Sequence, residues 1–478
     1  MERMKRGMIS ALMVCLILLS HTGKVNAAGV SFAADEEGEF VPVPSVYETK
    51  GTIKNLEEYG FFNHPEDIFV DKNGILFVAD TGNNRILKIS VQGEVLGEYT
   101  EGFGMAFNKP KGVYVHDDGT IWIADTGNFR LVCLNDAGGD EKIFYKPESS
   151  LLEESFTFSP EKIYVSATGY IYILKGTNMM LMDAQNHFKG YVGAANVPFS
   201  LKRLLIRTFG TRSQIERTMR QEPAAYTNFM VGSDAMVYGI LANEKSDQIR
   251  KLNSVGKNVY PKKRYGFDIP IGNKTYLQPM FSDIAVMDNG IITLTDRNAG
   301  LLYQYDQEGN LLAVFGGNGE VKGTYQNPVG IAADARGNLY VLDYTSNTIT
   351  ILEPTKFIRT VHKAVGLYRE GKYDEAKVYW REVLALDSNY ALAHQGYAKV
   401  LYKEKDYEGA MAEYYLAEDA EGYSKSFAEY RHELFRTYFA GIVILTMVIL
   451  LAIWKVLVLL KKKADRLAHR IEMGGTLE

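Results

Sequence analysis

A repeat of about 45 residues is the feature that most restricts how this 478-residue chain can fold. Residues 64–85 read HPEDIFVDKNGILFVADTGNNR, and residues 109–130 read KPKGVYVHDDGTIWIADTGNFR, at an offset of 45. Each copy predicts a strand that begins after a proline, a polar turn with glycine, a second apolar strand and a Thr-Gly-Asn turn. One such sheet cannot bury both of its faces, so the copies must pack against one another.

Four weaker copies follow, and their second strands end at Lys175, near residue 241, and at Asp296 and Asp343. Six similar sheets are best accommodated as blades around a common axis. The last copy ends where a helical pattern begins, near Thr355. We therefore expect a strand from residues 46–56 to complete the sixth sheet and remove its open edge.

The turn after the second strand resembles the NHL repeat, most fully at 80–85 and 125–130. The resemblance implies a mainly β fold, a six-bladed NHL-like β-propeller over residues 45–355. We interpret the turn residues as structural: aspartates that accept backbone N–H bonds, glycines with positive φ, and arginines that pair with a carboxylate. They are Asp80, Gly82, Arg85, Asp125, Gly127, Arg130, Asp296 and Asp343; the last two copies lack the arginine.

A basic insertion separates the third and fourth copies. Residues 201–222 read LKRLLIRTFGTRSQIERTMRQE, which has a helical composition with one apolar side. One interpretation is a helix that lies on anionic lipid or binds a partner. The interpretation we favour is a solvated helix packed against the propeller rim.

A second, 34-residue period occupies residues 357–424. Small and aromatic residues recur in pairs that resemble two tetratricopeptide repeats, followed by a capping helix, so that residues 356–437 form an α-helical unit. The packing positions are Ala364, Tyr373, Ala376, Trp380, Ala398, Tyr407, Ala410 and Tyr414. Two repeats are fewer than independent stability usually requires, and the pair serves either as a peptide-binding groove or as a stalk.

Both ends of the chain predict membrane targeting. Residues 1–27 have a basic start, an apolar run of 11 residues and Val25-Asn26-Ala27, the pattern of a signal peptide. Residues 438–460 form a 23-residue apolar run, about 34 Å as a helix and enough to span a bilayer. The basic tail 461–478 should remain in the cytoplasm, which places the large N-terminal part outside a cell membrane crossed once.

Catalytic residues are harder to find. Acidic residues at the starts of the innermost strands, Glu66, Asp67, Glu161 and Asp283, could meet at the channel mouth and hold Ca²⁺. Partial acidity at strand starts is common, however, so no cofactor is the main expectation. The two cysteines exclude a disulfide scaffold and a thiolate zinc site. A net charge of −5 and the predicted export argue against nucleic-acid binding.

These features predict a membrane-anchored binding or scaffold protein outside the cytoplasm and not an enzyme. Its propeller and helical repeats would recruit a protein or extracellular ligand, as an accessory to a membrane complex. The alternative is a surface-anchored, lactonase-like hydrolase or lyase with a divalent metal in the channel.

Overall fold

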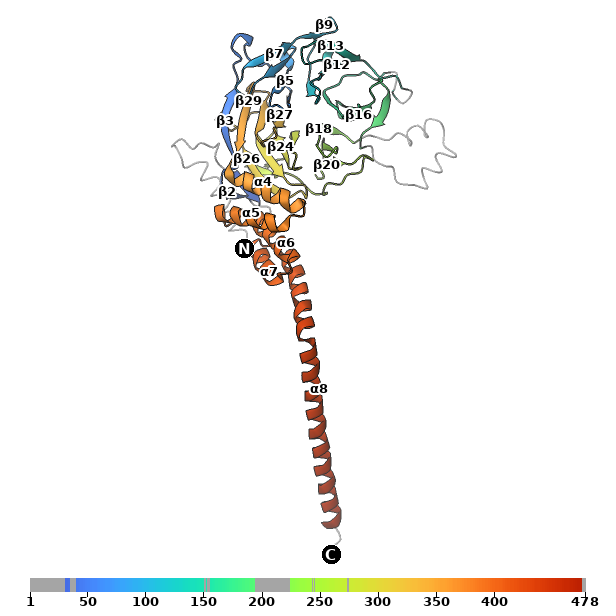
Figure 1. The fold of residues 1–478 in the computed structure, drawn as a ribbon, viewed down its shortest axis with the longest axis vertical. Coiled ribbons are helices and arrows are strands. Elements are labelled where there is room, and N and C mark those ends of the chain that lie inside the picture. Colours follow the sequence, from blue (N-terminus) through green and yellow to red (C-terminus); the bar gives the residue numbers. More distant parts are fainter. Residues whose placement is uncertain are drawn as a thin grey trace, which may run out of the picture. The chain divides into compact units, whose positions relative to one another are not determined.

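The structure is a computed structural model that describes residues 31–34, 40–149, 152, 155–193, 224–242, 244, 246–272 and 275–474. The chain divides into two compact units, 1–392 and 393–478 (Figure 1). The first unit contains a six-bladed β-propeller, as the repeat predicted. The predicted signal peptide and the insertion 201–222 lie outside the described residues.

The first three blades are regular four-stranded antiparallel sheets, numbered from the axis outward. Blade one contains β4 (Asp67–Val70), β5 (Leu76–Asp80), β6 (Arg85–Ile89) and β7 (Val95–Tyr99). Blade two contains β10 (Gly112–Val115), β11 (Ile121–Asp125), β12 (Arg130–Leu134) and β13 (Asp140–Phe144). Blade three contains β14 (Lys162–Val165), β15 (Ile171–Lys175), β16 (Asn178–Met182) and β17 (Phe188–Tyr191).

The remaining blades depart from this plan. Blade four has three described strands, β18 (Tyr226–Val231), β19 (Val237–Leu241) and β20 (Ile249–Leu252). Blade five contains β23 (Phe281–Val286), β24 (Ile292–Asp296), β25 (Leu301–Tyr305) and β26 (Leu311–Gly316), and β1 (Ser31–Ala34) and β2 (Phe40–Val43) extend it outward. The sequence pattern gave no sign of these two N-terminal strands.

An N-terminal strand closes the ring in blade six, as expected from residues 46–56. This blade contains β27 (Pro328–Ala333), β28 (Leu339–Asp343), β29 (Thr348–Pro354) and then β3 (Tyr47–Ile53). Strand β3 pairs antiparallel with β29, with Ile53 opposite Ile349 and Tyr47 opposite Pro354. The pairing satisfies the backbone groups that would otherwise form an open sheet edge.

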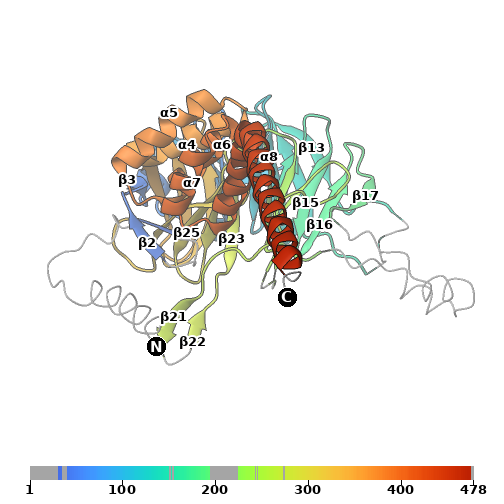
Figure 2. The ribbon, with the colours of Figure 1, turned by 90° about the horizontal axis from the view of Figure 1, so that it is seen from below.

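Two short hairpins lie outside the blades. The hairpin of β8 (Glu101–Gly102) and β9 (Met105–Ala106) follows blade one. The hairpin of β21 (Ile269–Gly272) and β22 (Thr275–Leu277) precedes blade five and projects from the propeller (Figure 2).

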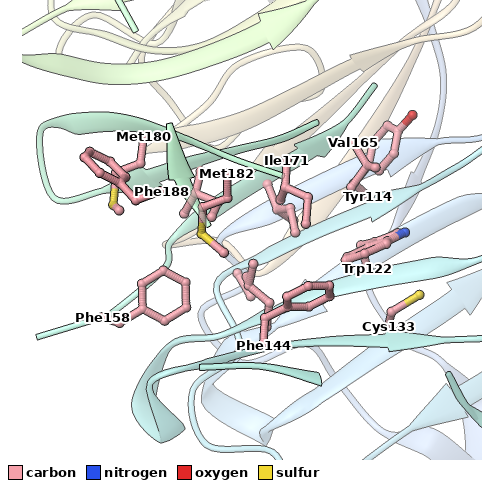
Figure 3. Packing of buried hydrophobic residues seen from close by; sticks show 14 residues of the cluster. Tyr114, Trp122, Cys133, Phe144, Phe158, Val165, Ile171, Met180, Met182 and Phe188 are labelled. Carbon is pink, nitrogen blue, oxygen red and sulfur yellow. The ribbon is translucent and has the colours of Figure 1, made fainter. Parts of the chain in front are cut away.

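Apolar side chains fill the space between neighbouring blades. Between blades two and three, Trp122 stacks on Phe144 with ring centroids 5.6 Å apart, and Phe158, Ile171 and Met182 are buried in the same cluster (Figure 3). The second strands of blades one and two are apolar up to their final aspartate and fully buried, because both of their faces meet another sheet. This explains why those strands show continuous apolar runs without alternation. In blade three, Tyr172 and Lys175 of β15 are only half-buried.

The first helical pair belongs to the propeller unit. Helix α4 (Lys356–Arg369) follows β29, and α5 (Tyr373–Leu386) packs against it. Nε2 of His362 lies 2.6 Å from Oε1 of Gln304 in blade five, and the Tyr390 hydroxyl donates to the Leu312 carbonyl at 2.8 Å. The division at Leu392 therefore lies within the predicted helical segment and not at its start, residue 356.

The second unit contains α6 (Ala391–Lys403, from residue 393), α7 (Tyr407–Leu416) and α8 (Ala420–Gly474). The rings of Tyr402 and Tyr407 contact at 5.5 Å, and Tyr368 and Tyr373 make the equivalent contact in the first pair at 5.2 Å. The other predicted packing residues, Ala364, Ala376, Trp380, Ala398, Ala410 and Tyr414, are buried. The geometry matches paired helices; their identity as tetratricopeptide repeats stays a prediction.

Helix α8 is long and apolar enough to cross a membrane. It includes the predicted span 438–460 and continues without a break into the basic segment after it. The apolar window of this helix has no side chains buried within the protein, which fits a membrane anchor.

Candidate functional site at the propeller axis

The six innermost strands bring one equivalent position each to the axis. In every blade this residue lies opposite the next-to-last residue of the second strand. In blade order these six residues are Asp67, Gly112, Lys162, Asn228, Asp283 and Gly330. The ring therefore combines two carboxylates, one ammonium group, one amide and two glycines.

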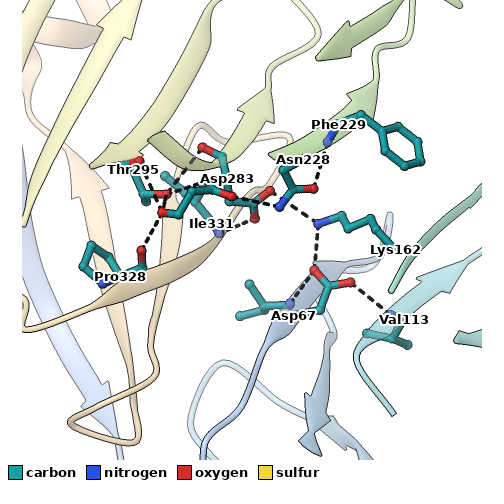
Figure 4. Close-up of polar contacts among 11 residues, drawn as sticks. Asp67, Val113, Lys162, Asn228, Phe229, Asp283, Thr295, Pro328 and Ile331 are labelled. Atoms are coloured by element: carbon teal, nitrogen blue, oxygen red, sulfur yellow. Dashed lines mark hydrogen bonds and ion pairs between the residues drawn. The ribbon is translucent and has the colours of Figure 1, made fainter. Parts of the chain in front are cut away.

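Lys162 lies between the two aspartates (Figure 4). Its Nζ is 2.7 Å from Oδ1 of Asp67 and 3.4 Å from Oδ1 of Asp283. The Lys162 side chain is 15% exposed, and the aspartates are 3% and 1% exposed. Blades one, three and five thus meet through one buried cation, which links chain segments about 100 residues apart.

The remaining aspartate oxygens bind the next blade. Oδ2 of Asp67 accepts from the Val113 amide at 3.0 Å, and Oδ2 of Asp283 accepts from the Ile331 amide at 2.8 Å. Each of these amides follows a glycine of the ring. A Cβ on Gly112 would lie 2.5 Å from the Glu161 carbonyl oxygen, so only glycine permits this approach of blades two and three.

The charges in this cluster do not balance, because two carboxylates share one ammonium group. Burial raises the pKa of Asp283 to about 6; Lys162 opposes this shift and the Asp67 charge adds to it. Burial disfavours the charged form of Lys162, but the attraction of Asp283 and Asp67 outweighs it and raises the Lys162 pKa. The cluster thus keeps one excess buried negative charge, which lowers the stability of the folded protein.

Only two of the four predicted channel-mouth acids meet. Glu66 pairs instead with Lys111, whose Nζ is 3.0 Å from Oε2. Burial disfavours the charged form of Lys111, while Glu66 and, more weakly, Glu161 raise the Lys111 pKa. Asp67 and Asp283 are joined through Lys162, which the sequence reasoning missed although the repeat places it at the position of Asp67.

The donor set at the axis fits an internal ammonium group. A divalent cation between Asp67 and Asp283 would have to displace Lys162 and also compete with two backbone amides. Within the described ranges, no three His, Cys, Asp or Glu side chains are grouped to hold a metal ion.

A narrow apolar cavity of about 50 Å³ continues along the axis from Lys162. Phe69, Tyr114, Tyr164 and Phe229 from four innermost strands line it. The Tyr114 ring contacts Phe69 at 5.1 Å and Tyr164 at 4.7 Å. This volume has room for a few water molecules and not for a drug-sized ligand.

The repeat turns form a second set of buried polar groups. Oδ2 of Asp80 accepts from Nε of Arg85 at 2.8 Å, and its Oδ1 accepts from the Asn63 amide at 2.7 Å. In blade two, Asp125 repeats both contacts with Arg130 and Asn108 at 2.6 and 2.8 Å. The predicted pairing of both arginines with a carboxylate is confirmed.

The predicted reason for the turn glycines is wrong. Gly82 and Gly127 lie in 3₁₀ turns (Thr81–Asn83 and Thr126–Asn128) without positive φ, and the left-handed residues are Asn84 and Phe129. A Cβ on either glycine would lie 2.5 Å from a backbone oxygen of the preceding loop. Glycine is needed there for close approach and not for its φ.

The two aspartates without an arginine differ from each other. Oδ2 of Asp343 accepts from the amides of Gln326 and Asn327, and its Oδ1 accepts from those of Thr345 and Ser346, at 2.7–3.0 Å. Oδ1 of Asp296 accepts from the Met280 amide, but its Oδ2 is buried without a hydrogen-bond partner among the described residues. Burial accordingly raises the Asp296 pKa.

The chain is similar to a family model and, distantly, to several solved structures. The family model described as NHL repeat matches residues 62–89 and 107–134. A streptogramin B lyase structure is 14% identical, covering 65% of this chain and 98% of that one, with a TM-score of 0.41. Virginiamycin B lyase from Staphylococcus aureus is 13% identical (68% and 88%, TM-score 0.38). A protein of unknown function from Bacteroides thetaiotaomicron is 12% identical (70% and 92%, TM-score 0.43).

No curated protein matches the sequence. The family match coincides with blades one and two, where the Asp–Arg turn is complete. The chain therefore carries NHL repeats within a six-bladed β-propeller.

Proposed function

We propose that this protein is a membrane-anchored binding or scaffold protein whose propeller and helices face the outside of the cell and recruit a protein partner. The observation that carries the proposal is the ion cluster at the axis. Lys162 and backbone amides occupy the Asp67 and Asp283 oxygens, and the cavity beside them holds only about 50 Å³. Among the residues that the structure describes, the axis thus offers a substrate no free carboxylate, and its cavity is small for one.

The long apolar part of α8 supports the membrane anchor. The predicted signal peptide and the basic residues after the span support an orientation with the propeller outside. Propellers and helical repeats both offer broad surfaces for protein recognition. No cofactor and no nucleic acid are part of this proposal.

The test is chemical cross-linking on membranes followed by purification of the full chain under mild detergent. A membrane-associated protein should be recovered in a fixed ratio to the chain. A matched anchored control, in which residues 31–392 are deleted and the signal peptide and residues 393–478 kept, should lose it. Repeated recovery of the chain alone would contradict the proposal.

The hydrolase or lyase alternative keeps one supporting observation, the raised pKa of the buried Asp283 carboxyl at the axis. It requires a divalent ion to displace Lys162. If Ca²⁺ raised the midpoint of thermal unfolding and a chelator lowered it, and Asp283→Asn abolished both effects, the alternative would replace the binding role.

A further inference from the structure

The end of helix α8 brings a strongly cationic segment to the edge of the apolar span. The helix runs without a break through residues 438–460 and into the segment that follows them (Figure 1). Residues 461–470 contain five lysines or arginines and one carboxylate, that of Asp465. All of these side chains are exposed. Net positive charge therefore begins where the apolar residues end.

Lys455 is the single charged residue of the span and lies five residues before its end. An ammonium group within the hydrocarbon is costly unless it reaches the interface or pairs with an anion. The nearest carboxylate along α8 is that of Asp465, ten residues or about 15 Å away along the helix axis. Within the described part of the second unit, Lys455 forms no ion pair. An anion for Lys455 therefore has to come from outside this helix.

Two cations after the span lie on the same face of α8 as Lys455. At about 100° per residue, Lys455, Lys462 and Arg466 fall within an arc of about 40° and extend about 17 Å along the axis. No ion pair joins Asp465 to Lys462 or Arg466 in the part of α8 that the structure describes. We call these three residues the cationic face of α8.

The cationic face lies at the depth of the lipid headgroups. The polar layer on each side of a bilayer is about 5–8 Å thick. Lys462 lies about 3 Å beyond the end of the span, and Arg466 lies about 9 Å beyond it. Side chains on a helix lean toward its N-terminus, which brings the Arg466 guanidinium back into this layer. The long stem of Lys455 can snorkel toward the same layer from the hydrocarbon side.

We propose that the cationic face of α8 binds the headgroup of an anionic phospholipid. The span itself selects the occupant, because it holds these cations beside the lipid phosphates of one leaflet. The charge favours a lipid with a net negative headgroup over a zwitterionic one, whose own cation is repelled by the site. The inference goes beyond recruitment of a protein partner and depends only on α8 crossing the membrane.

The test measures which lipid contacts Trp454, the neighbour of Lys455. The full chain is reconstituted in nanodiscs with equal amounts of phosphatidylglycerol and phosphatidylcholine, and one of the two lipids carries brominated acyl chains, which quench nearby tryptophans. The signal of Trp454→Phe is subtracted, because Trp122 and Trp380 are buried outside the span. Phosphatidylglycerol should be preferred at least about fivefold, which is about the contribution of one lysine or arginine at an anionic surface.

Two double variants remove the same charge from different faces of the helix. Lys462→Gln/Arg466→Gln should lower the preference for phosphatidylglycerol to less than about twofold. Its matched control is Lys461→Gln/Lys463→Gln, which changes cations at a similar depth but about 80–120° away from Lys455 around the helix, and it should keep the preference.

A second variant acts from within the span and leaves the basic segment unchanged. Lys455→Leu should also lower the preference for phosphatidylglycerol, and Lys455→Arg, which keeps the charge, should retain it. Equal quenching by the two brominated lipids, equal loss of the preference in both double variants, or its loss on addition of millimolar inorganic phosphate would overturn the lipid site and leave the membrane anchor intact. If neither brominated lipid quenched Trp454, the anchor itself would be contradicted, and the lipid site with it.

Discussion

Replacing Lys162 by methionine tests the ion cluster at the axis directly. Methionine has a similar length but no charge, so Asp67 and Asp283 would remain buried beside each other without a cation. Removing one partner of a buried ion pair typically costs about 3–5 kcal/mol of folding free energy. For a propeller of this size that corresponds to a decrease of roughly 5–10 °C in the midpoint of thermal unfolding.

The assay is thermal unfolding of the full chain in detergent, followed by intrinsic tryptophan fluorescence, to which the buried Trp122 contributes. Lys142→Met is the matched control, because Lys142 is exposed on β13, and it should change stability by less than about 0.5 kcal/mol. Adding Asp283→Asn to Lys162→Met should recover part of the loss, since only one buried carboxylate then remains.

The stability lost in Lys162→Met should also depend on pH. Without Lys162, which holds the pKa of Asp283 down, the pKa of Asp283 in the folded protein rises further above the value in the unfolded chain. The folded variant then binds more protons than the unfolded one, so its stability increases as pH falls from 8 to 5 and the deficit relative to the unmodified protein narrows. A loss below 1 kcal/mol at pH 8, or a deficit that widens toward pH 5, would refute the reasoning.

Three further changes test other parts of the structure. Asp283→Asn removes a carboxylate whose pKa is raised to about 6, so it should stabilise the protein by up to about 3 kcal/mol above pH 7. This gain in stability should vanish near pH 4. Denaturant titrations at pH 8 and pH 4 measure it, and a variant that is less stable than the unmodified protein at pH 8 would contradict the prediction. Leu301→Arg restores the arginine opposite Asp296 in the register of Arg85 opposite Asp80, and it should raise stability by about 1–2 kcal/mol and lower the Asp296 pKa; Leu301→Met, measured in parallel, should do neither. Deleting residues 31–43 should leave a protease-resistant propeller, whereas deleting residues 31–53 also removes β3 and should yield a digestible chain; equal resistance of the two would contradict the role of β3 in closure.

The sequence was sufficient to predict the propeller because its signal is local and repeated. The strand, turn and strand of blades one and two each lie within about 22 residues, and the paired Asp80–Arg85 and Asp125–Arg130 mark the turns. The closing strand β3 could be predicted only by counting, since the sixth copy lacked its last strand.

The axis cluster was only half predicted, because it joins residues that no local pattern connects. Asp67 and Asp283 are acidic residues at strand starts, and they suggested a metal site. Lys162 completes them from a third blade, and aligning the copies places it at the same ring position as both aspartates. Comparing residue types around the whole ring, instead of collecting acids alone, would have suggested an ion pair.

The closure of blade six also has a consequence for how the protein is made. Strand β3 is synthesised early, and its partner β29 follows roughly 300 residues later, so β3 must wait unpaired while the intervening blades are made. A product that stops before residue 348 never receives that partner and keeps an open sheet edge for proteases or aggregation. Closure of blade six therefore requires both ends of the propeller sequence, because β3 is paired only once β29 has been synthesised.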